Sequence, residues 1–181
     1  MGIILETASF AGIILEAASF AKLKHSGQTR KYNGTPYIFH PCRVAGRLAT
    51  HRDATDEMVA AAYLHDVLED TGTTVEELRS KFGTQVAELV DSLTNKSKET
   101  GLPRAERKRL DKERISEICY RAKLIKLMDR IDNLREIDLA NDAEFAKMYA
   151  NESLSLLEVL RDVDDELTIE LETVIKGILC S

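Results

Sequence analysis

Residues 57–70 read EMVAAAYLHDVLED. The first eight of these residues are almost entirely apolar. In a helix, their apolar side chains would be distributed around all sides of the axis and not along one face. A helix that is apolar nearly all round is buried on most sides. We therefore predict a buried helix that begins near Asp56 and continues as far as Asp70.

The end of this predicted helix carries four ionisable residues, His65, Asp66, Glu69 and Asp70. Residues four apart share one face of a helix, so His65 is expected to lie over Glu69, and Asp66 over Asp70. Burying such groups is costly unless they have partners. Imidazole and carboxylate groups together suit Mn, Fe, Zn or Ni. The pattern favours a divalent metal site, while histidines hydrogen-bonded within a core stay open as the alternative.

Two residues elsewhere in the chain can complete such a site. His40 stands directly before Pro41, which suits the first position of a helix and so places His40 at or near the N-cap. Asp129 lies in a helical pattern, and Asn133 shares its face four residues later. Taken alone, Asp129 is better explained by an ion pair with Arg130 or Lys126 on the same helix.

Length and composition favour one all-helical domain. The chain has 181 residues and a mass of 20.3 kDa, the size of a single ordinary domain. With 44% hydrophobic residues, 9 Gly and 3 Pro, it favours helix over a β-sandwich or barrel. Thr74–Glu77 has the form of a capping box, Gly83 marks a helix end, and the polar segment 96–102 is expected to be a loop. We predict an all-α fold, a single bundle of roughly eight to ten helices.

Charge and cysteine content limit the classes of partner. The net charge of -6 argues against general nucleic-acid binding, which needs a basic surface. Residues 17–52 hold seven basic and no acidic side chains, which indicates a small anionic ligand or a solvated helix face. The most apolar stretch, residues 2–20, contains two glutamates, so we expect no membrane segment. Three scattered cysteines predict a reducing, cytoplasmic location, and no residue pattern specifies an oligomeric state.

The N-terminus contains a near-exact repeat, since IILETASFA at 3–11 recurs as IILEAASFA at 13–21. A step of ten residues turns a helix by about 1000°, roughly 80° short of three full turns. The two copies therefore cannot present the same face to one core in a straight helix. We predict a helical extension over 1–12 and the main domain over 13–181, with only the second copy docking fully. An amphipathic arm or a dimer contact is the alternative.

Five blocks of the sequence, in matching order, resemble the hydrolase domain of the RelA/SpoT family. They are GQTRK at 27–31, GTPYIFHP at 34–41, LHDVLEDT at 64–71, FG at 82–83 and KLMDRIDNLR at 126–135. The resemblance covers roughly residues 13–160 and is closest to the stand-alone small alarmone hydrolases. It implies an HD-type helical domain, a metal-dependent phosphohydrolase that acts on (p)ppGpp.

The resemblance also implies a role for each matching residue. The expected ligands of one Mn²⁺ ion are His40, His65, Asp66 and Asp129. Glu69 and Asp70 match the carboxylates that act on the attacking water. The residues expected to contact the guanine nucleotide are Arg30, Lys31, Asn133 and Tyr149. The implied reaction is hydrolysis of the 3′-diphosphate, which yields GDP or GTP and pyrophosphate.

Two other functions remain open at the level of sequence. The first is hydrolysis of another purine nucleotide on the same scaffold, such as removal of the 2′-phosphate of NADPH. The second is a non-catalytic alarmone sensor, which would keep the pocket without the chemistry. A sensor has no physical need for a water-activating carboxylate such as Glu69, so the sequence favours an enzyme.

Overall fold

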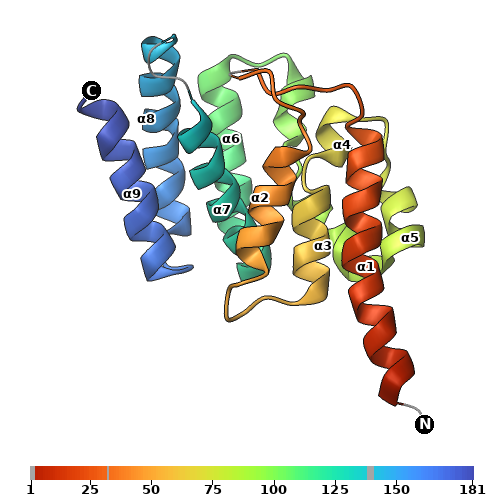
Figure 1. The fold of residues 1–181 in the computed structure, drawn as a ribbon. Coiled ribbons are helices and arrows are strands. Elements are labelled where there is room, and N and C mark those ends of the chain that lie inside the picture. The colour runs from red at the N-terminus through yellow and green to blue at the C-terminus, as the bar shows by residue number, and fades with distance from the viewer. Residues whose placement is uncertain (1–2, 32, 138–140) are drawn as a thin grey trace. The chain divides into compact units, whose positions relative to one another are not determined.

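The computed structural model describes residues 3–31, 33–137 and 141–181, and over these ranges the protein is all-helical (Figure 1). Side chains are described over the same ranges except at 3–11, 98 and 99. Apart from one isolated antiparallel bridge between Thr29 and Pro36, these residues contain no β-structure. The predicted all-α fold is confirmed.

The helices fall into two compact units, and each is described by itself. The first unit, Met1–Arg30 with Thr35–Thr94, contains α1 (Ile3–Lys24), α2 (Phe39–Leu48), α3 (Asp56–Leu64), α4 (Val67–Asp70) and α5 (Val75–Leu93). The second unit, Lys31–Gly34 with Asn95–Ser181, contains the 3-10 helix η1 (Lys96–Thr100), α6 (Arg104–Glu117), α7 (Tyr120–Glu136), α8 (Ala143–Leu160) and α9 (Asp165–Leu179).

Helix α1 spans both copies of the N-terminal repeat. It crosses the predicted division between residues 12 and 13 without a break in the helix, and that division stays a prediction. In the second copy, Ala17 and Ala21 are fully buried. The side chains of the first copy lie outside the described residues, and so does the prediction about how that copy docks.

Helix α3 forms the centre of the first unit, where α1, α2 and α5 pack against it. The hydroxyl oxygen of Thr55 caps its start by accepting the amide of Met58 at 3.3 Å. The buried residues of α3 are Met58, Val59, Ala60, Ala61, Ala62 and Leu64. The predicted burial of this helix on most sides is therefore confirmed. Burial of each larger side chain, such as Leu64, contributes about 1.5–3 kcal/mol.

The helix predicted to continue from α3 is instead interrupted at His65 and Asp66. The ring Nδ1 of His65 lies 2.7 Å from the carbonyl oxygen of Ala62. In an unbroken helix that carbonyl accepts the amide of residue 66, so a side-chain donor competes with the helical pattern. The chain restarts as α4, where the carbonyl of Asp66 accepts the amides of Glu69 at 3.2 Å and Asp70 at 3.0 Å. The prediction of one continuous helix as far as Asp70 was wrong, and the alignment of His65 over Glu69 stays a prediction.

Helix α2 begins two residues earlier than predicted, at Phe39 rather than at Pro41. Pro41 occupies the third position, where its missing N–H costs no hydrogen bond because amides in the first turn have no acceptor within the helix. Ile38 is the N-cap, and His40 lies inside the first turn with its side chain 1% exposed. The predicted first position of Pro41 was wrong, while His40 does lie near the N-cap, in the first turn of the helix.

Helix α5 is formed by two helical segments joined at Gly83. The hydroxyl oxygen of Thr74 caps the first segment by accepting the amide of Glu77 at 3.1 Å. Gly83 has a φ of 83°, a conformation in which a side chain would be strained. The predicted cap and the predicted helix end at Gly83 are both confirmed.

The segment 96–102, predicted to be a loop, forms η1 over Lys96–Thr100. The side-chain oxygen of Asn95 accepts the amide of Ser97 at 2.9 Å. Asn95 and Ser97 then donate to the carboxylate of Asp111 in α6, at 2.7 Å and 3.1 Å. These bonds from short polar side chains order the segment against α6, although its composition resembles that of a loop.

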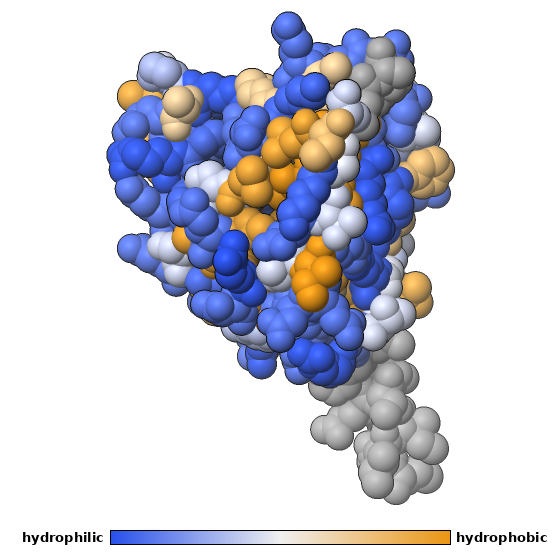
Figure 2. Space-filling view, turned by 90° about the vertical axis from the view of Figure 1, so that its left-hand side faces the viewer, coloured by the Kyte–Doolittle hydropathy of each residue, from blue (hydrophilic) through white to orange (hydrophobic). Residues whose placement is uncertain are grey.

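The second unit is built around α7, which packs against α8 and α9, while α6 packs against α8. Figure 2 looks onto the side on which α8 and α9 lie, where hydrophilic side chains cover most of the surface around a limited apolar strip. The large hydrophobic residues exposed on these two helices are Met148, Leu154 and Ile169. Among the helices described, none is both long and apolar enough to cross a membrane.

Candidate active site

Three of the predicted metal ligands converge in the first unit. The Nε2 atom of His40 lies 3.2 Å from Nε2 of His65 and 3.6 Å from Oδ2 of Asp66. Nε2 of His65 lies 3.1 Å from the same carboxylate oxygen. Both histidines are buried, and Asp66 is partly exposed. Two imidazole nitrogens and a carboxylate oxygen, all within 4.8 Å of one another, form a candidate site for a divalent metal ion.

The orientation of the His65 ring fits metal binding. Its Nδ1 faces the carbonyl oxygen of Ala62, which can only accept a hydrogen bond, so the ring carries a proton on Nδ1. In the neutral ring, Nε2 then presents its lone pair toward His40 and Asp66. Histidines that bind metals are commonly oriented by such a hydrogen bond from the second ring nitrogen. The donor set and the tautomer therefore both suit a divalent cation.

Tyr37 belongs to this site although the sequence did not single it out. Its hydroxyl donates to Oδ2 of Asp66 at 2.7 Å and also lies 3.1 Å from Oδ2 of Asp70. The ring stacks on His25 at 4.7 Å between centroids, and the guanidinium carbon of Arg30 lies 5.3 Å from the ring centroid. Burial raises the pKa of the Tyr37 phenol, as do the two carboxylates, and Arg30 opposes them. The phenol therefore stays protonated and acts as a donor.

Helix α4 carries both predicted catalytic carboxylates. It begins directly after Asp66, with Glu69 half-buried and Asp70 exposed. Nε2 of Gln28 donates to the backbone carbonyl of Asp70 at 2.8 Å, and Oε1 of Gln28 accepts from Nδ1 of His25 at 2.7 Å. These two hydrogen bonds connect the end of α4 to the segment that follows α1. The two carboxylates are therefore on a short helix fixed by side-chain contacts, within one helical turn of Asp66.

Arg30 and Lys31, the two basic residues predicted to contact the nucleotide, have different environments. Arg30 is 7% exposed and lies beside the ring of Tyr37, so the structure groups it with the cluster. Its amide donates to the carbonyl of Thr35 at 2.8 Å, and Gly34, with a φ of 67°, turns the chain between them. Lys31 is exposed and falls within the second unit.

In the second unit, α7 brings two predicted site residues together. The buried carboxylate of Asp129 accepts from Nδ2 of Asn133 at 2.5 Å and from Nζ of Lys126 at 2.8 Å. The ion pair with a basic neighbour, which the sequence left open as an alternative, is thus present. It does not conflict with metal binding, because a carboxylate has several acceptor positions. The role of Asp129 as a fourth ligand stays a prediction.

Tyr149, in α8, lies beside Arg130 of α7, whose guanidinium carbon is 4.5 Å from the tyrosine ring centroid. Burial raises the pKa of the Tyr149 phenol, and the Arg130 charge opposes this rise. The phenol is therefore neutral, and its predicted contact with a nucleotide stays a prediction.

The hydrogen bond from Tyr37 gives a first testable expectation. Tyr37→Phe removes the hydroxyl that orients Asp66 and keeps the ring that packs on His25. Losing a partner that orients a metal ligand typically costs 10–100-fold in metal affinity or activity, so we expect Mn²⁺ affinity to fall about tenfold. Titration of metal-free protein with Mn²⁺ measures this change. Tyr120→Phe, at an exposed tyrosine, is the matched control, and equal affinities in the two variants would contradict the role of Tyr37.

Comparison with known proteins places the chain in a family. The HD domain profile matches residues 17–162. A zebrafish (Danio rerio) protein named guanosine-3′,5′-bis(diphosphate) 3′-pyrophosphohydrolase MESH1 is 44% identical over 138 residues, which are 75% of this chain and 69% of that protein. The human (Homo sapiens) protein of the same name is 46% identical over 138 residues, with the same coverage of both chains.

A solved structure agrees with these relatives. It is described as a metazoan ortholog of SpoT that hydrolyzes ppGpp, and it matches with a TM-score of 0.78 at 31% identity. The match covers 91% of this chain and 94% of the other. The resemblance read from the five sequence blocks is confirmed at the level of the family. The chain belongs to the HD domain family, among its MESH1-like members.

Proposed function

We propose that this chain is a metal-dependent hydrolase that removes the 3′-diphosphate of guanosine-3′,5′-bis(diphosphate), releasing GDP and pyrophosphate. The observation that carries the proposal is the convergence of His40, His65 and Asp66 beside a helix that bears two carboxylates. The names of the relatives support the choice of substrate. With pppGpp as substrate, the corresponding products are GTP and pyrophosphate.

The proposed cofactor is one Mn²⁺ ion, held by His40, His65, Asp66 and Asp129. When bound, such an ion lowers the pKa of a water molecule and offsets charge on a phosphoryl oxygen. The support for these ligands is the donor set in the first unit and the match of Asp129 to the family pattern. Tyr37 donates to Asp66 and so orients one of the ligands.

In the proposed reaction, Glu69 takes a proton from the attacking water, and Asp70 assists. The water oxygen bonds to the phosphorus that the 3′ oxygen carries, and the bond between that phosphorus and the 3′ oxygen breaks. The 3′ oxygen takes up a proton and leaves as the ribose hydroxyl. Arg30 and Lys31 hold the nucleotide, with Asn133 and Tyr149 as further contacts. The guanidinium of Arg30 can stack on a base or donate two parallel hydrogen bonds to a phosphate, whereas the ammonium of Lys31 supplies a compact positive charge.

The proposed contacts of Arg30 and Lys31 with the nucleotide predict a change in KM for ppGpp. We expect Arg30→Ala and Lys31→Ala to raise KM for ppGpp, by about tenfold or more for Arg30, because a hydrogen bond to a charged group contributes about 1.5–3 kcal/mol. Steady-state kinetics together with metal analysis measure both effects, and metal content is expected to stay at the parent level. Arg52→Ala, at an exposed arginine of the unit that contains Arg30, is the control. An unchanged KM in both variants would leave Arg30 and Lys31 without a role in binding.

The proposed activity is tested directly with the purified chain. Incubation with ppGpp and Mn²⁺ is expected to produce GDP and pyrophosphate in equal amounts, measured by ion-exchange chromatography and a pyrophosphate assay. EDTA is expected to stop the reaction. NADPH in parallel reactions tests the second substrate class, with release of inorganic phosphate as the readout. No turnover of ppGpp despite bound metal and tight nucleotide binding would favour a sensor.

We also propose a cytoplasmic location. All three cysteines are free thiols in the structure, namely Cys42, Cys119 and Cys180. Free thiols are typical of proteins from reducing compartments. Fractionation of cells that express the protein tests this location.

A further inference from the structure

A basic cavity lies within the second unit, between α6, α7 and α8. It has a volume of about 270 Å³. Six basic side chains line it: Lys108, Arg109, Lys112, Arg114, Lys126 and Arg130. Two acidic side chains line the same cavity, Asp111 and Glu152. The proposed catalytic role of the chain makes no use of most of these residues.

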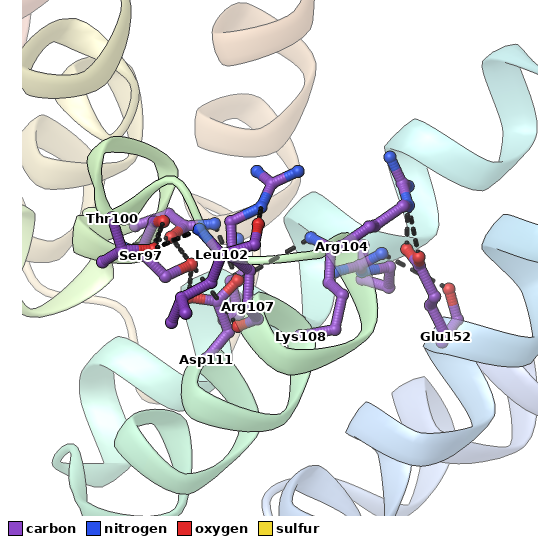
Figure 3. A network of polar contacts seen from close by, with 12 residues as sticks. Ser97, Thr100, Leu102, Arg104, Arg107, Lys108, Asp111 and Glu152 are labelled. Atoms are coloured by element: carbon purple, nitrogen blue, oxygen red, sulfur yellow. Dashed lines mark hydrogen bonds and ion pairs between the residues drawn. The ribbon is translucent and has the colours of Figure 1, made fainter.

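The two carboxylates of the cavity wall are already engaged by other groups. Glu152 accepts two bonds from the guanidinium of Arg104, at 2.6 Å and 3.0 Å. Asp111 accepts from Asn95 at 2.7 Å and from Ser97 at 3.1 Å. Figure 3 shows these two networks on either side of Lys108. Glu152 is therefore already paired with Arg104, and Asp111, although held by Asn95 and Ser97, also forms a long ion pair with Lys108 at 3.8 Å.

Arg130 is a buried charge without an ionic partner among the described residues. Its side chain is 6% exposed, and no carboxylate forms an ion pair with it in the described part of the chain. Its polar contact is a long one, 3.5 Å from a terminal nitrogen to the Ser153 hydroxyl, and its Nε has no hydrogen-bond partner there. A charge taken out of water costs several kcal/mol unless it is paired. The stacking on Tyr149 offsets only part of such a cost.

Lys108 adds a second positive charge, and its ion pair with Asp111 is a long one. Its Nζ lies 3.8 Å from Asp111, beyond hydrogen-bonding distance. Burial lowers the pKa of Lys108, and repulsion by the Arg130 guanidinium lowers it further, while the carboxylates of Glu152 and Asp111 oppose part of this shift. The two cations therefore face the same cavity and destabilise each other, which an anion between them would relieve.

We infer that this cavity binds a phosphate or diphosphate group, with Arg130 and Lys108 as its principal contacts. A guanidinium presents paired donors to phosphate oxygens, and a lysine supplies a compact charge. Such a group has two possible sources. One is the second diphosphate of the proposed substrate, in which case the inference rests on the proposed function. The other is free phosphate or pyrophosphate.

Calorimetric titration with pyrophosphate tests the site without any hydrolysis. The full chain is titrated in EDTA, and we expect saturable binding that becomes at least about tenfold weaker in Arg130→Gln and in Lys108→Met. Arg130→Lys, which keeps the charge, is expected to recover part of the affinity. Arg121→Gln, at an exposed arginine of the same helix, is the matched control. No saturable binding, or less than a twofold change in both variants, would overturn the inference.

Thermal unfolding separates a binding role from a purely structural one. Lys108→Met removes one of two repelling cations, so without anion its melting temperature is expected to equal or exceed that of the parent. Addition of pyrophosphate is expected to raise the melting temperature of the parent by more than that of the variant. A variant that melts well below the parent and responds to pyrophosphate as strongly as the parent would show that Lys108 is structural and overturn its role as a contact. This measurement also stands if Arg130→Gln does not fold.

Kinetics with two substrates distinguish the sources. If the cavity takes the second diphosphate of the substrate, Lys108→Met raises KM for guanosine-3′,5′-bis(diphosphate) but not for guanosine 3′-diphosphate. If it takes a free anion, KM for both stays unchanged, and added pyrophosphate alters the rate of the parent only. Equal kinetics with no response to pyrophosphate would overturn the inference. If the chain hydrolyses neither nucleotide, the proposed function fails while the calorimetric result still decides the site.

Discussion

The double variant His65→Ala/Asp66→Ala is expected to lose bound metal and all metal-dependent turnover. The parent should carry about one divalent ion per chain, as expected for one cluster of this donor set. The variant removes two of the three donor groups that converge in the first unit, and leaves only His40 and Asp129 of the four proposed ligands. Elemental analysis after dialysis measures occupancy, and ppGpp hydrolysis with added Mn²⁺ measures turnover.

Stability provides an independent readout of the same change. A ligand that binds only the folded state stabilises it, by about 2.7 kcal/mol when its concentration is a hundred times Kd. Added Mn²⁺ is therefore expected to raise the melting temperature of the parent and to leave that of the double variant unchanged. His51→Ala/Asp53→Ala replaces another His and Asp pair, after α2, and is the matched control. Equal metal occupancy in the parent and in His65→Ala/Asp66→Ala would refute the assignment.

Glu69→Gln is expected to reduce kcat by about 10² or more, the usual scale for the loss of a general base. The substitution keeps the shape of the side chain and removes its charge and its ability to accept a proton. Metal content and ppGpp affinity are expected to stay close to those of the parent, because Glu69 is not among the predicted ligands. An equal fall in kcat and kcat/KM indicates an interaction made mainly in the transition state. Single-turnover and steady-state kinetics measure it.

The control for this variant is Glu76→Gln, at an exposed glutamate in the first turn of α5. It removes the same charge from the same unit and is expected to leave turnover unchanged. If Glu69→Gln abolishes metal binding instead, Glu69 is a ligand. If it leaves turnover at the parent level, Glu69 does not activate the water, and Asp70 becomes the candidate base.

The sequence predicted the elements whose cause is local. The burial of α3 follows from an apolar run of helix formers, and the cap at Thr74 and the break at Gly83 follow from single residues with specific backbone preferences. The types of the candidate ligands are also local information. Imidazole next to carboxylate in an apolar helix is costly to bury unless a cation or another partner satisfies it.

A local side-chain bond and a tertiary contact together decided where the His65 side chain points. The pattern 57–70 reads as one helix, but the ring of His65 bonds to the carbonyl of Ala62, and the chain breaks before α4. The helical periodicity of the sequence does not reveal the break after α3, because the break depends on a side chain that competes with a backbone amide for a carbonyl acceptor. The break directs Nε2 of His65 toward His40, which lies 25 residues earlier in the chain.

Two site features depend on contacts that no sequence pattern records. Tyr37 stands three residues before His40 and looks like an ordinary aromatic residue, yet its hydroxyl donates to the carboxylate of Asp66, 29 residues later. Arg130 looks like a solvated helix charge, yet packing against α8 buries it beside Tyr149 without an ionic partner in the described residues. Sequence alone thus determined which chemical groups this protein has and where most of its helices lie. Packing decided which of those groups meet, because desolvation and hydrogen bonding depend on neighbours distant in the chain.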